Sequence, residues 1–156
     1  MNEFIDWLHA RVGNMIVRAV VAADDDAPKM QLLKVLGRRG EIKAGLEHLQ
    51  PYGFAFRVLP PDADGRGAET VALALEPDLR MCLPAADRRH RPAGLLPGEV
   101  MLHDDQGQRV HLTRAGLVLS TPVGKSITFK CGRSSIVIAD TGITITAPAI
   151  DQVKAV

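Results

Sequence analysis

The 156-residue sequence has little of what most binding and catalytic functions need. Phe, Trp and Tyr together make up only 4% of the chain, so there is little material for stacking nucleobases. The formal net charge is +1, which leaves no broad charged surface for DNA or an anionic membrane. We therefore expect no specific nucleic-acid binding.

Cysteines and long apolar runs are equally scarce. The two cysteines, Cys82 and Cys131, lie far apart without metal-ligand spacing, so we expect two buried free thiols and assembly in a reducing cytoplasm. No run approaches the roughly 18 apolar residues of a membrane span. No signal-peptide pattern is visible at the N-terminus. We expect a protein that is made soluble and meets a membrane only from outside, as a folded object.

Recognisable catalytic motifs are missing. Residues 37–40 form a Gly-Arg-Arg-Gly segment without the Gly-Lys-Ser/Thr ending of a phosphate loop, and no Gly-x-Ser-x-Gly elbow occurs. Residues 24–26 are three aspartates that favour a turn over a calcium loop, which needs spaced acids and a distal Glu. The basic run at 87–92 is short and is interpreted as a solvated loop. The sequence indicates a protein that is not an enzyme.

One group of residues resembles a metal site. His103, Asp104, Asp105 and His111 lie close together in the sequence, but their spacing matches no metal motif. His111 lies between two apolar residues of one predicted strand, so its side chain points to the opposite, outward face. We predict no metal ion and no cofactor.

The N-terminus predicts a short amphipathic helix over residues 2–12, stopped by Gly13 and Asn14. Phe4, Ile5 and Leu8 recur at helical spacing, and Trp7 lies close to that face. A helix of about three turns is marginal alone in water. It must therefore dock on its own domain or on a partner.

Short alternating segments separated by turn residues follow as far as about residue 84. Five or six strands in about 70 residues predict a small closed or partly closed barrel. The expected strands are residues 15–21, 29–36, 46–49, 54–59, 70–75 and 80–83.

An internal repeat dominates the C-terminal part. Residues 108–122 align without gaps to residues 134–148, and residues 126–130 supply another alternating strand. Two repeats are too few for a single-chain solenoid, and one chain cannot bury their apolar lines or pair their strand edges. Three chains wound around one axis solve both problems. The predicted trimer core is Val110, Leu112, Leu117, Leu119, Ile127, Phe129, Ile136, Ile138, Ile143 and Ile145.

Several motifs together resemble the Mu-like phage central spike family, also called baseplate assembly protein V. They are the helix running into Val-Arg-Ala-Val at 17–20, Met-Gln-Leu-Leu at 30–33, Gln-Pro-Tyr-Gly-Phe at 50–54, Leu-Pro-Gly-Glu at 96–99 and the repeat. The resemblance implies a non-enzymatic homotrimer of the virion tail, with an oligomer-binding fold near the tail hub and an intertwined triple-stranded β-helix that helps to pierce the host outer membrane.

This resemblance sets the expected organisation. It implies a mainly β chain with an N-terminal helix (1–14), an oligomer-binding-fold-like barrel (15–96), a trimeric β-helix (97–150) and a tail (151–156). Phe4, Ile5, Trp7 and Leu8 are the expected hub-binding residues. Family spikes often end in a His-x-His iron site, which this sequence lacks, so a blunt spike and a separate tip protein both stay open. The alternative function is an oligomer-binding-fold module for single-stranded nucleic acid or oligosaccharide.

Overall fold

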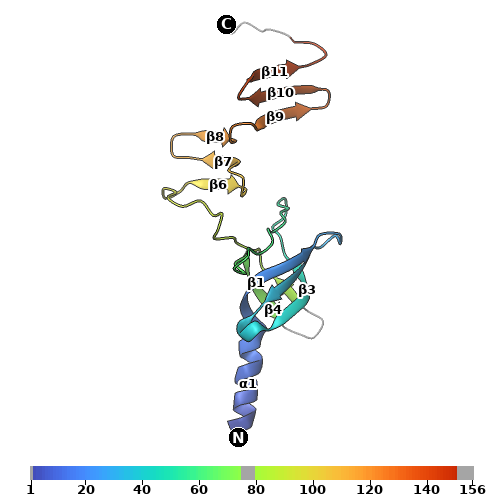
Figure 1. Cartoon of the computed structure of the whole chain (residues 1–156), viewed down its shortest axis with the longest axis vertical. Coiled ribbons are helices and arrows are strands. Elements are labelled where there is room, and N and C mark those ends of the chain that lie inside the picture. Colours follow the sequence, from blue (N-terminus) through green and yellow to red (C-terminus); the bar gives the residue numbers. More distant parts are fainter. Residues whose placement is uncertain (1, 75–79, 151–156) are drawn as a thin grey trace. The chain divides into compact units, whose positions relative to one another are not determined.

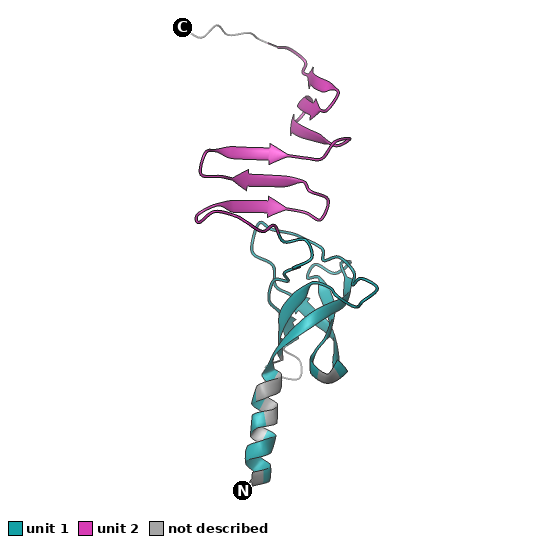
Figure 2. Cartoon of the chain, turned by 60° about the vertical axis from the view of Figure 1, so that its left-hand side comes forward, with its two compact units in different colours: residues 1–91 teal, residues 92–156 magenta. Residues whose placement is uncertain are grey.

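The computed structural model describes residues 2–74 and 80–150, with the side chains of a few further positions, among them Leu8, left undescribed. The chain divides into two compact units, Met1–Arg91 and Pro92–Val156 (Figure 2). The expected tail at 151–156 lies outside the described residues. None of the described helices is long and apolar enough to cross a membrane.

Helix α1 spans Asn2–Met15 and opens the first unit (Figure 1). The predicted helix is present, but the predicted stop at Gly13 and Asn14 is wrong. The helix passes through both residues and ends only where strand β1 begins at Ile16. Pairing with the barrel fixes this boundary, because Ile16 already lies opposite Leu73 in the sheet.

Five strands of the first unit close into a small barrel with the order β1-β2-β3-β5-β4. All neighbours are antiparallel except β3 and β5, which run parallel. The mainly β chain with a small barrel is therefore confirmed. The elements are β1 (Ile16–Asp25), β2 (Leu32–Leu36), a 3-10 turn (Arg38–Gly40), β3 (Ile42–His48), β4 (Glu69–Ala74) and β5 (Arg80–Cys82).

The barrel interior comes from the alternation of its strands. In β1 the side chains of Val17, Ala19 and Val21 are buried, and the intervening side chains are more exposed. Leu33, Val35, Leu46, Ala68, Ala72 and Cys82 complete the core. Burial raises the pKa of the Cys82 thiol to about 11. The expectation of two buried thiols is wrong for Cys131, which is exposed in the second unit.

The segment predicted as a strand at 54–59 is a loop. The alternation of apolar residues in this segment agrees with the contacts of two of its three side chains. Val58 packs on the core and Phe56 contacts a buried ring, but Phe54 is exposed. The Phe56 backbone bonds to a glutamine side chain rather than to a neighbouring strand. Alternation therefore predicted side-chain positions here without predicting the backbone.

The second unit consists of two three-stranded antiparallel sheets (Figure 1). The first contains β6 (Val100–His103), β7 (Arg109–Leu112) and β8 (Leu117–Ser120). The second contains β9 (Ser126–Cys131), β10 (Ser134–Ala139) and β11 (Gly142–Thr146). Every fully buried side chain of the described residues belongs to the first unit, so the described part of the second unit has no core of its own.

Candidate functional site

The first sheet of the second unit carries an apolar grid on one face. The strand register places Val100, Leu112 and Leu117 in one cross-strand row, and Leu102, Val110 and Leu119 in the next row on the same face. Residues directly opposite each other in antiparallel strands have neighbouring side chains. The six residues therefore form one continuous patch.

The second sheet repeats this grid. Phe129, Ile136 and Ile145 form one row, and Ile127, Ile138 and Ile143 form the other. The ten residues predicted as a trimer core thus all fall on these two grids, and Val100 and Leu102 complete the two rows of the first grid. Those two were missed because the repeat shifts by one residue at this point: the paired residues Leu102 and Val110 are eight positions apart, whereas the paired residues Phe129 and Ile136 are seven positions apart.

These apolar side chains are uncovered in the single chain. Ten of the twelve are exposed, from Ile138 at 39% to Ile143 at 66%, and only Val110 and Ile127 are half-buried. The opposite face of the second sheet is mostly polar, with Thr128 and Thr144 on either side of Val137. An exposed apolar patch of this extent marks an interaction surface.

His111 lies on the face opposite to the first grid, as its position in the strand predicted. Its Nε2 atom is 3.4 Å from a carboxylate oxygen of Glu99. Glu99 also accepts the backbone N–H groups of Leu96 and Arg114, which together with His111 hold the pKa of Glu99 below its ordinary value. Glu99 therefore ties the β6 entry to the β7–β8 turn.

The residues that resemble a metal site in the sequence make separate local contacts. His111 is directed to Glu99 rather than to His103. Asp104 accepts the backbone N–H groups of Gln106 and Gln108 and closes the β6–β7 turn. Among the described residues no three His, Cys, Asp or Glu side chains are grouped to hold a metal ion.

The basic run at 87–92 is engaged within the barrel unit. Arg88 pairs with Glu69, which also pairs with Arg18, and these arginines, Arg18 first, lower the pKa of Glu69. Arg89 bonds to Asp87 and to two backbone carbonyls of the 60–66 loop. Guanidinium groups held in this way brace loops, so they do not favour the nucleic-acid alternative.

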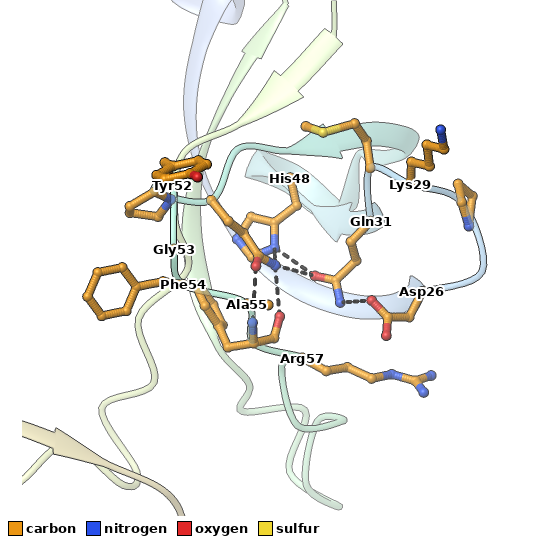
Figure 3. A pocket seen from close by; sticks show the side chains of 14 residues that line it. Asp26, Lys29, Gln31, His48, Tyr52, Gly53, Phe54, Ala55 and Arg57 are labelled. Atoms are coloured by element: carbon orange, nitrogen blue, oxygen red, sulfur yellow. Dashed lines mark hydrogen bonds between the residues drawn. The ribbon is translucent and has the colours of Figure 1, made fainter. Parts of the chain in front are cut away.

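The barrel unit also carries a hollow of about 450 Å³ beside the Gln-Pro-Tyr-Gly-Phe motif (Figure 3). The Gln50 carboxamide donates to the Phe56 carbonyl over 2.8 Å and accepts the Phe56 N–H over 3.0 Å. This side chain thus takes the place of a strand partner. The intervening loop turns at Gly53, whose positive φ suits glycine, and leaves Tyr52 fully exposed.

His48 forms the floor of the hollow. Its Nε2 atom accepts the Ala85 N–H over 3.1 Å, so its Nδ1 atom carries the proton and donates to Gln31 over 2.7 Å. Gln31 in turn donates to Asp26. Burial lowers the pKa of His48. Because both ring nitrogens are engaged, neither is free to take a proton from a ligand.

The expected hub-binding residues lie on α1. Phe4 and Trp7 are exposed, and their rings stack with centroids 5.9 Å apart. Ile5 is exposed as well, whereas the side chain of Leu8 lies outside the described part of the chain. Their role at a hub stays a prediction.

Comparison with known proteins gives two matches. Residues 18–89, which include all of the barrel strands except the first two residues of β1, match the model of the family described as Bacteriophage Mu Gp45, N-terminal. The chain is also similar to the baseplate puncturing device gp45 of Escherichia phage Mu, with 32% identity over 121 residues. That alignment covers 78% of this chain, and the chain spans 59% of the relative's length.

The barrel and the matches together define a class of protein, a component of the phage tail baseplate within the virion. Within that class the chain is similar to the Mu-like baseplate spike proteins, and its residues 18–89 match the N-terminal region of the Mu Gp45 family. The resemblance drawn from the sequence motifs is thereby confirmed.

Proposed function

We propose that three copies of this chain assemble into a baseplate spike whose second unit is an intertwined triple-stranded β-helix. The observation that carries the proposal is the pair of apolar grids, twelve side chains on two sheets with no cover from the described chain. Side chains of this size each gain about 1.5–3 kcal/mol when they are buried. A surface so large therefore favours association strongly.

The repetition of the grid indicates what covers it. Both sheets present the same two rows of three, so both need the same kind of cover. Copies of the chain around one rotation axis supply identical cover at each level, because symmetry repeats every contact. A single different partner would need to contain a matching repeat of its own.

The strand edges support the same arrangement. In the described chain β6 and β8 are the outer strands of one sheet, and β9 and β11 are the outer strands of the other. Outer strands offer unpaired backbone N–H and C=O groups, which pair readily with another chain. Winding three chains together satisfies these edges and gives a stiff rod.

The barrel and α1 suit attachment to the tail hub, and the second unit suits transmission of force to the host envelope. The strand order of the barrel, with its parallel β3–β5 pair, supports an oligomer-binding-fold topology. We infer that this barrel and α1, through Phe4, Ile5, Trp7 and Leu8, contact the tail hub. The relative from phage Mu is named a puncturing device. A rigid rod that transmits force to the host envelope, without catalysis, is the corresponding role for this chain.

The solution mass tests the assembly. Light scattering on the purified chain should give about three times 16.8 kDa at micromolar concentration. A mass of one chain would refute the spike. Tails assembled without the protein should bind host cells but fail to deliver DNA, and normal delivery by such tails would refute the piercing role.

A further inference from the structure

The spacing of apolar residues along α1 indicates packing between helices in addition to docking on a hub. Ile5, Leu8, Val12 and Met15 follow each other at steps of three, four and three residues. These steps are the a and d positions of two heptads, the repeat of helices that pack against copies of themselves. A stripe of this kind needs a helical partner along its whole length.

The barrel of the same chain does not provide this partner. Val12 is 58% exposed and Ile5 is 43% exposed, although both belong to the stripe. Phe4, which precedes Ile5 in the helix, is also exposed. Figure 1 shows α1 extending from the barrel with no other element of that unit alongside it.

The junction with the barrel prevents the helix from folding back. The last helical residue, Met15, is followed directly by the first strand residue, Ile16, without a linker. Ile16 and Val17 are fixed by pairing with Leu73 and Ala72 of β4. The stripe must therefore be covered by another molecule.

We propose that the α1 helices of three copies pack together, along this stripe, as a short parallel coiled coil. The proposal rests on the trimer proposed above, since a three-fold axis brings three equal helices together in parallel. Ile and Val at a with Leu at d would favour two helices when alone. Phe4 widens the apolar face to the g position, and the remainder of the trimer sets the number at three.

The same geometry divides the residues proposed for hub contact: in the coil Ile5 and Leu8 pack against the other copies, and contact with the hub is left to the outer side of the helix. Trp7 falls at the c position, away from the stripe, and stays on the outside of a three-helix coil. It remains available to a hub protein there. The coiled coil therefore presents the tryptophans outward at defined positions rather than on three independent helices.

Cysteine crosslinking in the full-length chain tests the packing. Cys131→Ser removes the exposed native thiol, and Cys82 is buried. On this background Ile5→Cys places a thiol in the stripe, and Asp6→Cys places one on the neighbouring residue outside it; Val12→Cys is a second stripe variant. Each is treated with a short bismaleimide and analysed on boiled gels, while its native mass is measured by light scattering.

We expect Ile5→Cys and Val12→Cys to give several-fold more covalent dimer than Asp6→Cys, at a native mass of three chains. Equal crosslinking of the stripe and control variants at that mass overturns the coiled coil and leaves the trimeric spike standing. A native mass of one chain for the Cys131→Ser parent overturns both proposals. A stripe variant that loses the trimer while Asp6→Cys keeps it supports the packing.

Discussion

Replacing Ile143 by aspartate is the sharpest test of which sheet face is buried between copies. In the single chain Ile143 is 66% exposed and lies opposite Ile138 in the grid. Val137 lies on the other face, between Thr128 and Thr144, and is half-buried. If the single chain were the functional form, Val137→Asp would be the more harmful change. If three copies bury the grid, Ile143→Asp is the more harmful change.

The size of the effect follows from burial. Each Ile143→Asp chain loses about 1.5–3 kcal/mol of apolar burial. Each also places a carboxyl group in an apolar interior, which costs at least about 1–3 kcal/mol even after neutralisation. Three chains together lose on the order of 10 kcal/mol, comparable to the whole net stability of a typical domain. Trimers of Ile143→Asp should therefore be absent at micromolar concentration.

Light scattering of the two variants at neutral pH is the assay. We expect a mass of one chain for Ile143→Asp and of three chains for Val137→Asp. Lowering the pH below about 4 protonates carboxyl groups and should restore part of the Ile143→Asp trimer. Equal masses for the two variants, or a stronger defect in Val137→Asp, would show that the wrong face has been assigned to the axis.

Three further outcomes are expected. Chains wound around each other must unwind together, so the wild-type trimer should survive SDS without boiling, and prompt migration as a monomer would contradict winding. Deleting residues 2–12 should keep the three-chain mass but leave tails without a spike; normal occupancy in purified tails would remove α1 as the anchor. The lowered pKa of His48 means that the unfolded chain takes up a proton first as pH falls, so barrel stability should drop below about pH 6.5. His48→Gln should flatten that dependence in melts at pH 7.5 and 5.5, and an unchanged dependence would exclude His48 as its source.

The repeat was the most predictable part of the chain. Strict alternation fixes which residues share a face, so Ile136, Ile138, Ile143 and Ile145 could be assigned to one face without coordinates. The glycine at 142 marked the β10–β11 turn, where its backbone has a positive φ. Val100 and Leu102 lie before the aligned segments and were missed, because turn length, rather than alternation, sets the register of β6.

The barrel loops could not be predicted in the same way. The Gln50 side chain forms the hydrogen bonds to the Phe56 backbone that a neighbouring strand would otherwise form. No periodic pattern in the sequence predicts an interaction of this kind. The engagement of Arg88 and Arg89 depends likewise on partners distant in the sequence, Glu69 and the 60–66 loop. Helix α1 continues past Gly13 because its end is set by the pairing of Ile16 with β4. This tertiary contact could not be predicted from the local sequence.

The absence of any fully buried side chain among the described residues of the second unit has a consequence for the order of folding during synthesis. The barrel has its core within one chain, so it can form on a single polypeptide soon after that segment leaves the ribosome. In the proposed trimer the two sheets that follow gain their apolar contacts only on meeting other copies, and a lone three-stranded sheet without such cover is at best marginally stable. Their folding rate should therefore rise with protein concentration.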